Sequence, residues 1–190
     1  MEIILATKNK GKLKEVKEIL SGFNVVGMEE IGIDIDVIED GDTFEANAIK
    51  KAVEIMEATG KIVLSDDSGL EIDFLDKEPG VDSANYLGRE TPYPQRNAII
   101  LDMLKNTAFE ERSARYVAVI AAAFPDGKTL TAEGVLEGYI GYEQRGENGF
   151  GYDPIFYPKG LSQSVAELSS DEKNTISHRG IALRKMKEIL

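Results

Sequence analysis

The feature that most constrains the fold is a pair of strand-like segments joined by a tight turn. Residues 116–124 (YVAVIAAAF) form a long apolar run, PDGK follows as a turn, and residues 129–140 return as a partner. Strands joined by so short a connection run antiparallel, so these residues predict a β-hairpin. Because strands and helices alternate elsewhere in the chain, the hairpin predicts an α/β fold with a mixed sheet.

Short apolar segments alternate with amphipathic ones over most of the remaining chain. Strands are predicted at 2–6 and 24–28, and the helix between them has an inward face of Leu13, Val16, Ile19 and Leu20. Thr43 is a suitable N-cap for a helix that reaches about Thr59 and ends at Gly60. Two further helices are predicted at 94–105 and 177–190, with inward faces of Ala98, Leu101 and Leu104, and of Ile181, Leu183, Met186, Ile189 and Leu190.

Three segments carry less regular patterns. From Ile31 to Val37 every second residue is apolar, which predicts a half-exposed strand or an extended arm. IVLSDDSGL (62–70) predicts a short strand that ends in a turn at its two aspartates and Ser-Gly, after which 70–75 resume a strand. The glycine-rich GENGFGYDPIFYP (146–158) predicts a loop followed by a strand.

Composition limits the classes of function. The length of 190 residues suits one domain, or two closely joined lobes, over 1–190, and 42% hydrophobic residues suffice for a packed core. The absence of cysteine excludes disulfides and thiolate chemistry. A net charge of −12 argues against a nucleic-acid polymer as partner, although a small nucleotide can still bind a local basic pocket. No apolar run approaches the roughly 18 residues of a membrane span, and no basic region precedes the first apolar segment. We therefore expect a soluble, cytoplasmic protein.

The first candidate site is TKNKGK, residues 7–12. It lies between a predicted strand and a predicted helix, where backbone N–H groups and the helix dipole favour an anion. Lys8, Lys10 and Lys12 add positive charge there. The segment is neither a P-loop nor a dinucleotide fingerprint, so the pattern fits a phosphate site and a solvated basic turn equally well.

A second candidate site is acidic. Asp66 and Asp67 are adjacent carboxylates of the kind that suit Mg²⁺, and neighbouring side chains of extended backbone point to opposite sides. We therefore expect them to have different roles. Glu39, Asp40 and Asp42 could add a metal ligand or could simply complement the dipole of the following helix. Lys51, within that helix, would ordinarily be a solvated lysine.

The last two candidates lie near the C-terminus. In FGYD (150–153), Phe150 or Tyr152 could stack on a base, although an aromatic side chain beside glycine often just packs a turn. His178 is the single histidine of the chain and, with Arg179, opens the last predicted helix. Two basic groups at a positive helix end favour an anionic or carbonyl-bearing partner, whereas a lone histidine can equally be structural.

Five motifs in this order resemble the inosine triphosphate pyrophosphatases over residues 3–187. They are TxNxxK (Thr7, Asn9, Lys12), SDDSGL, the PG-xxS loop (Pro79, Gly80, Ser83), GFGYDPIF and KNxxSHRG. The resemblance implies an elongated α/β fold of two lobes around a deep cleft, usually in a homodimer. It also implies Mg²⁺-dependent conversion of ITP, dITP and XTP to the nucleoside monophosphate and pyrophosphate.

The resemblance assigns roles to individual positions. Thr7, Lys8, Asn9, Lys10, Gly11 and Lys12 would hold the triphosphate together with Lys51. Asp67 would be the base and a magnesium ligand, Glu39 a further metal ligand, Asp66 a possible one, and Ser68 a substrate contact. Phe150, Gly151, Tyr152, Asp153, Lys173, His178 and Arg179 would surround the nucleoside. Asn85 stands where many relatives carry arginine.

These roles predict how one base is chosen over another. Hypoxanthine and xanthine carry a carbonyl acceptor at C6, whereas adenine carries an amine donor there. Donors supplied by His178 and Arg179 would satisfy the carbonyl and would oppose the amine. Two other classes stay open: a related-fold phosphatase or pyrophosphatase of the Maf type, which lacks the FGYD and SHRG elements, and a nucleotide-binding regulator without turnover.

Overall fold

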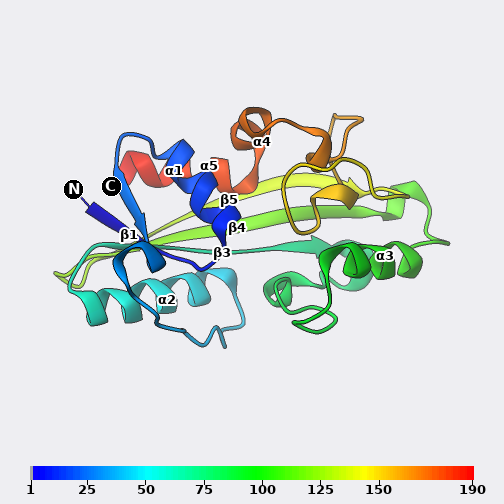
Figure 1. Cartoon of the computed structure of the whole chain (residues 1–190). Coiled ribbons are helices and arrows are strands. Elements are labelled where there is room, and N and C mark those ends of the chain that lie inside the picture. The colour runs from blue at the N-terminus through cyan, green and yellow to red at the C-terminus, as the bar shows by residue number, and fades with distance from the viewer. Residues whose placement is uncertain (1) are drawn as a thin grey trace. The chain divides into compact units, whose positions relative to one another are not determined.

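The computed structural model describes residues 2–190 and shows a mixed α/β fold (Figure 1). The strands are β1 (Glu2–Ala6), β2 (Asn24–Gly27), β3 (Val63–Ile72), β4 (Ser113–Ala123), β5 (Thr129–Ile140) and β6 (Phe156–Pro158). The helices are α1 (Lys10–Ile19), α2 (Phe44–Thr59), α3 (Tyr93–Met103), α4 (Ser170–Ile176) and α5 (His178–Ile189). One sheet has the strand order β2-β1-β3-β4-β5-β6, in which β1 is parallel to β2 and β3, and β5 is antiparallel to β6. The predicted fold class is confirmed.

The chain divides into two compact units. Unit 1 contains the residues up to Asp67, residues 118–134 and residues 178–190, and unit 2 contains residues 68–117 and 135–177. Strands β3, β4 and β5 each contribute residues to both units.

Unit 1 buries an aliphatic core between its helices and its part of the sheet. In Figure 1, α1 and α5 lie on one face of the strands and α2 lies on the other. Val16 of α1 and Leu20, which follows this helix, pack with Leu183 and Met186 of α5, and all four are fully buried. The caps of α2 are as predicted, because the Thr43 hydroxyl accepts a hydrogen bond from the Ala46 N–H and Gly60 ends the helix with a positive φ.

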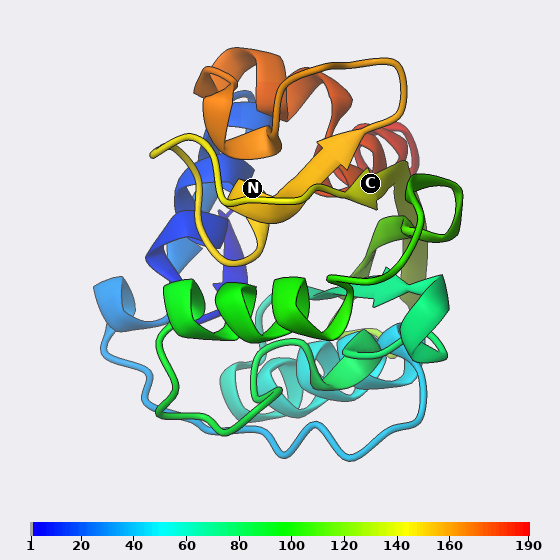
Figure 2. The ribbon, with the colours of Figure 1, turned by 90° about the vertical axis from the view of Figure 1, so that its right-hand side faces the viewer.

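Unit 2 has a separate core that is richer in aromatic side chains. Ile100 and Leu104 from the region of α3 pack with Tyr116 of β4, and Tyr152 and Phe156 belong to the same cluster. Figure 2 shows α3 in green, with the yellow segment that leads to β6 above it. The predicted loop and strand at 146–158 are confirmed as a series of turns followed by β6.

Two strand predictions need correction. The SDDSG segment is not a turn, because β3 continues without interruption from Val63 to Ile72. The polar groups inside this strand have partners, such as the Ser65 hydroxyl that donates to the Ala48 carbonyl at 2.5 Å. Residues 33–40 form no strand, although half-buried Ile33, Ile35 and Val37 do alternate with exposed residues, as expected for an extended arm.

Three helix predictions also change. Ala98 is exposed, and the buried side chains of α3 are Arg96, Asn97 and Ile100. Ile189 is 46% exposed, whereas Leu183 and Met186 are buried as predicted, together with His178, Arg179, Gly180 and Ala182 near the start of α5. The short helix α4 was missed, although Ser169 and Glu172 form a capping box that the S-x-x-E pattern indicates.

Candidate active site

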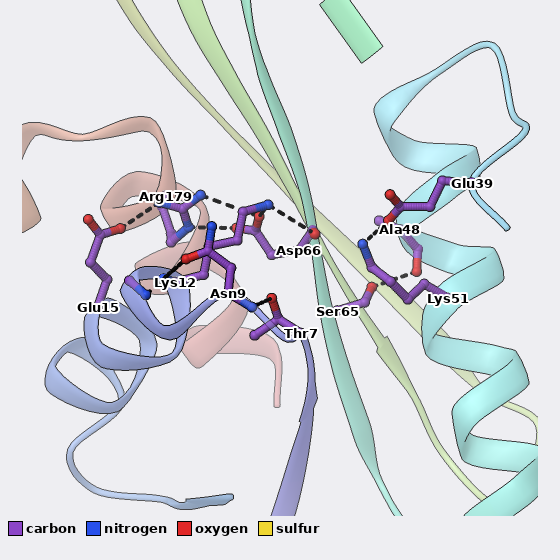
Figure 3. A network of polar contacts seen from close by, with 11 residues as sticks. Thr7, Asn9, Lys12, Glu15, Glu39, Ala48, Lys51, Ser65, Asp66 and Arg179 are labelled. Atoms are coloured by element: carbon purple, nitrogen blue, oxygen red, sulfur yellow. Dashed lines mark hydrogen bonds and ion pairs between the residues drawn. The ribbon is translucent and has the colours of Figure 1, made fainter. Parts of the chain in front are cut away.

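The TKNKGK segment forms the turn between β1 and α1 in unit 1. The side-chain oxygen of Asn9 accepts hydrogen bonds from the N–H groups of Gly11 at 2.9 Å and Lys12 at 3.1 Å. The Thr7 hydroxyl in turn accepts one from the Asn9 N–H at 3.1 Å (Figure 3). The side chain of Asn9 therefore accepts from two backbone N–H groups at the start of α1 that the sequence had assigned to an anion. The positive charge of this turn lies mainly on its lysines.

The lysines of this turn have different surroundings. Lys8 is exposed and pairs with Asp34 at 2.9 Å and Asp36 at 3.6 Å on the extended arm. Lys10 is exposed at the first position of α1. Lys12 is largely buried and forms an ion pair with Asp66. A cavity of about 250 Å³ borders the turn, with residues 7–10 on one side and residues 27–30 on the other.

Four charged side chains form a buried network in unit 1: Lys12, Glu15, Asp66 and Arg179. The guanidinium of Arg179 donates from Nε to Asp66 Oδ2 at 2.7 Å and from Nη1 to Glu15 (Figure 3). Asp66 is 1% exposed and also pairs with Lys12. Burial alone would raise the pKa of Asp66, but the attraction of Arg179 and Lys12 outweighs burial and holds that pKa well below 3.8.

Asp67, the next residue of β3, has the opposite electrostatic environment. It is 6% exposed, and burial raises its pKa from 3.8 to about 6, although the positive charges of Lys51 and Lys12 oppose the rise. Successive side chains of a strand point to opposite faces, so Asp67 points away from the side on which Asp66 meets Arg179. The two adjacent aspartates are therefore chemically distinct at neutral pH, as the sequence predicted.

Lys51 of α2 forms an ion pair with Glu39 of the extended arm (Figure 3). The Lys51 side chain is 16% exposed, so it is not the solvated lysine that its position in a helix suggested. The negative charge of Glu39 contributes to the raised pKa of Asp67, so both residues act on the same region of unit 1. Within residues 2–190 no group of three or more acidic or histidine side chains is arranged to hold a metal ion.

The aromatic FGYD segment (Phe150–Asp153) belongs to unit 2. Asp153 is 3% exposed; it accepts hydrogen bonds from the Phe150 N–H at 2.9 Å and from Lys173 Nζ at 2.7 Å. Lys173 Nζ also lies 4.3 Å from the centre of the Phe150 ring. Gly149, with a φ of +72°, permits this close packing because a Cβ there would lie 2.1 Å from an Asp153 oxygen.

The two aromatic rings of this segment differ in exposure. Tyr152 is 3% exposed and its ring is part of the unit 2 core, whereas Phe150 is half-buried. The ring of Phe150 is therefore more accessible than that of Tyr152. Gly151 is half-buried beside them, and so is Ser68 in β3.

His178 and Arg179 begin α5 and lie in unit 1 together with Asp67. His178 is 5% exposed and Arg179 is 2% exposed. The carboxylates of Asp66 and Glu15 raise the pKa of Arg179 above its ordinary value, against the opposing effect of burial, so this side chain stays charged. Its guanidinium donates to Asp66 and Glu15 within the buried network, and the sequence did not indicate these two contacts.

Sequence reasoning missed three polar residues that shape these clusters. Glu15 reaches Arg179 across 164 positions of the chain, a separation at which no local pattern connects two residues. The Tyr116 hydroxyl donates to Asp153 at 3.2 Å from within an apolar strand. Arg96 is buried in α3, where the helical periodicity predicted an apolar face.

Comparisons with known proteins agree with one another. The model of the Ham1 family matches residues 3–189. The chain is 49% identical to a dITP/XTP pyrophosphatase of Desulforamulus reducens and 48% identical to one of Bacillus subtilis, in both cases over its full length and 96% of the relative. Its structure is similar to the Ham1 protein of Staphylococcus aureus, with a TM-score of 0.89 and 41% identity over 100% of this chain and 97% of that one. No helix in residues 2–190 is long and apolar enough to span a membrane.

Proposed function

The chain belongs to the Ham1 family, and on that premise we propose that it is a pyrophosphatase of non-standard purine nucleoside triphosphates. Its substrates would include dITP and XTP, the compounds for which its relatives are named. The products would be the nucleoside monophosphate and pyrophosphate. The observation that carries this proposal is the pair of adjacent aspartates in β3, one held ionised by two cations and the other with a pKa near neutrality.

The electrostatics of the pair favour Asp67 as the general base. A useful base has a pKa near the working pH, because it must be unprotonated at the start and able to take up a proton. In the metal-free protein Asp67, with a pKa of about 6, meets this condition. Asp66 does not, because Arg179 and Lys12 stabilise its charged form so strongly that a proton would have little affinity for it.

The proposed reaction is the attack of one water molecule on the α-phosphorus. The water oxygen forms a bond to phosphorus while the bond from that phosphorus to the bridging oxygen breaks. Pyrophosphate leaves with the electron pair of the broken bond, and the water proton passes to Asp67. Lys12 and Lys51 would neutralise negative charge on the phosphate chain, and both already lie close enough to Asp67 to affect its pKa.

The acidic residues of unit 1 fit a magnesium ion. Mg²⁺ is commonly held by one or two carboxylates together with substrate phosphates and waters, so a cage of three acidic side chains is not required. Asp67 and Glu39 would be the two carboxylates, while Asp66 is committed to Lys12 and Arg179. When bound, the ion would supply charge neutralisation and orientation of the phosphate oxygens.

We propose that Phe150, Lys173 and His178 recognise the purine. Phe150 offers a half-buried ring that Lys173 and Asp153 hold in place. Lys173 and His178 are donors that match the C6 carbonyl of hypoxanthine and xanthine, and adenine presents a donor at the same position. His178→Ala should therefore lower the ratio of dITP to dATP turnover; an unchanged ratio would exclude His178 as a reader of the base.

The decisive experiment measures pyrophosphate and orthophosphate separately with Mg²⁺ and a panel of nucleotides. We expect pyrophosphate from dITP, ITP and XTP and little from the four common triphosphates. Asp67→Asn should lower kcat by about 10²–10⁴-fold, the usual contribution of a general base, with the fold retained. Asp126→Asn is the matched control, because this aspartate lies in the exposed turn between β4 and β5 and should leave kcat unchanged.

The same assay separates the alternative functions. Orthophosphate release would indicate a phosphatase, and a preference for pyrimidine nucleotides would indicate an enzyme of the Maf type. Binding without release of either product would indicate a regulator. An Asp67→Asn protein with near wild-type kcat would exclude Asp67 as the base.

A further inference from the structure

Helix α3 buries two polar side chains that the proposed function does not use. Arg96 is 2% exposed and Asn97 is 1% exposed, whereas the sequence predicted an inward face of Ala98, Leu101 and Leu104 for this helix. Burying a guanidinium is unfavourable unless its donors find acceptors, so the contacts of Arg96 indicate what this residue is for.

Arg96 donates five hydrogen bonds to main-chain carbonyls of one loop, residues 83–91. Nε reaches the carbonyl of Thr91 at 2.8 Å. Nη1 reaches those of Ala84 at 2.8 Å and Ser83 at 3.4 Å, and Nη2 those of Gly88 at 2.9 Å and Arg89 at 3.0 Å. One side chain therefore fixes the path of the whole 83–91 loop.

The 83–91 loop is joined to the FGYD segment through Tyr152. The Tyr152 hydroxyl donates to the Ser83 carbonyl at 2.7 Å, and Ser83 is one of the residues that Arg96 holds. Burial raises the pKa of Tyr152 to about 12, so the hydroxyl keeps the proton that it donates. The guanidinium of Arg96 also lies 4.8 Å above the ring of Tyr93, which meets the ring of Tyr152 edge-on at 5.2 Å.

Asn97 contacts the FGYD segment directly. Its amide nitrogen donates to the Gly151 carbonyl at 3.2 Å, between Phe150 and Tyr152. The segment is thus anchored at the Gly151 carbonyl by Asn97 and at the Tyr152 side chain by the Ser83 carbonyl and the Tyr93 ring. Phe150 is the residue of the segment whose ring remains half-buried rather than packed in the core.

We propose that Arg96 and Asn97 are positioning residues for purine recognition. They fix the 83–91 loop and the FGYD segment relative to α3, and thereby set the position of the Phe150 ring. This inference rests on the proposed function, because it assigns to Phe150 the contact with the base. The proposed function assigns the triphosphate to residues of unit 1, so loss of Arg96 or Asn97 should weaken binding of the nucleoside and leave binding of the phosphates unaffected.

The test compares Arg96→Lys and Asn97→Ser with the wild-type enzyme. A lysine can replace one or two of the five hydrogen bonds of Arg96, and serine is too short to reach the Gly151 carbonyl. For each variant we expect the KM for dITP to rise about tenfold, kcat to stay within about threefold, and the preference for dITP over dATP to fall. The inhibition constant of inorganic tripolyphosphate, which has no base, should stay within about twofold.

Arg112→Lys is the matched control. Arg112 is 1% exposed in unit 2 and also donates to main-chain carbonyls, but these belong to Leu104, Ile140 and Gly141, outside the FGYD segment. If Arg96 were merely structural, both lysine variants would lower the melting temperature and neither would change KM or base preference.

Two results would overturn the proposal. One is a folded Arg96→Lys or Asn97→Ser enzyme whose KM and base preference match those of Arg112→Lys. The other is a rise of the tripolyphosphate inhibition constant in parallel with KM. Asn97→Ser decides the question if Arg96→Lys does not fold. Failure of the proposed function is distinguishable, because the wild-type enzyme would then release no pyrophosphate from dITP.

Discussion

Replacing each of the adjacent aspartates of β3 with asparagine should change the free energy of unfolding in opposite directions. Burial destabilises the charged carboxylate of Asp67, which is why its pKa is raised. Asp67→Asn removes this buried charge, so the folded protein should become more stable at neutral pH. In Asp66→Asn the buried cations Arg179 and Lys12 lose their shared carboxylate, so the folded protein should become less stable. The same Asp-to-Asn substitution, made separately at these two neighbouring positions, thus tests the electrostatic description of both aspartates.

The magnitude for Asp67 follows from its pKa. The difference between about 6 in the folded protein and the ordinary 3.8 is about 2.2 pH units, which corresponds to about 3 kcal/mol at about 1.36 kcal/mol per unit. Between these two values the folded state binds more protons than the unfolded state. The stability that protonated Asp67 contributes is therefore fully present below about pH 4 and is lost as pH rises through about 6. At pH 8 the Asp67→Asn protein should exceed the wild type by up to about 3 kcal/mol, and at pH 4 the two should be nearly equal.

Asp66 has the reverse linkage. Its pKa lies well below 3.8 in the folded protein, so the stability it contributes is present above that value and is lost only in strong acid. Asp66→Asn should cost about 3–5 kcal/mol at neutral pH, the usual effect of breaking a buried ion pair from one side.

Urea titrations at pH 4, 6 and 8 measure both effects. For a chain of 190 residues, about 3 kcal/mol also corresponds to about 6–12 °C in melting temperature. The reasoning is refuted if Asp67→Asn is no more stable than the wild type at pH 8, or if its advantage is the same at all three pH values. Equal destabilisation by both substitutions would show that the two aspartates share one environment.

Three further outcomes are expected from the same structure. Glu15→Gln should cost about 3 kcal/mol in urea titrations because Arg179 loses one of its two carboxylates; exposed Glu18→Gln on the same helix is the control, and an equal loss in both would remove Glu15 from the network. Gly134→Ala should cost about 1–3 kcal/mol, because its Cβ would lie 2.0 Å from the His178 carbonyl oxygen at the start of α5; Gly22→Ala, which meets nothing within 4 Å, should be nearly neutral, and a neutral Gly134→Ala would contradict this packing. Millimolar Mg²⁺ should raise the melting temperature of the wild type at pH 8 more than that of Asp67→Asn, and equal shifts would argue against Asp67 as a ligand.

The sequence predicted the parts of the fold that local chemistry determines. Thr43 and Gly60 mark the ends of α2, and the PDGK turn specifies the hairpin, because caps and turns depend on a few neighbouring residues. The interruption expected within β3 did not occur. Asp, Ser and Gly are uncommon in strands, but partners distant in sequence, among them Arg179, satisfy the polar groups there.

The candidate site was predictable as a set of motifs but not as a set of interactions. The chain pattern placed Asp66 and Asp67 on opposite sides of an extended segment, and their different pKa values agree with that expectation. Nothing in the pattern indicated that Arg179 would pair with Asp66 and Glu15, since these residues come from three separate elements. Likewise, the periodicity of α3 could not show that Arg96 and Asn97 would be buried, because that burial depends on carbonyl groups of the preceding 83–91 loop and of Gly151.

Because β3 is uninterrupted, the face on which each of its aspartates lies depends on the number of residues that precede it in the strand. Each step of one residue along a strand reverses the face on which a side chain lies. Inserting or deleting a single residue between Val63 and Ser65 would turn Asp67 toward the cations of Lys12 and Arg179 and carry Asp66 to the other face, without changing any residue type. This part of the chain should therefore tolerate substitutions far better than changes in length, much as a coding sequence tolerates point changes better than frameshifts.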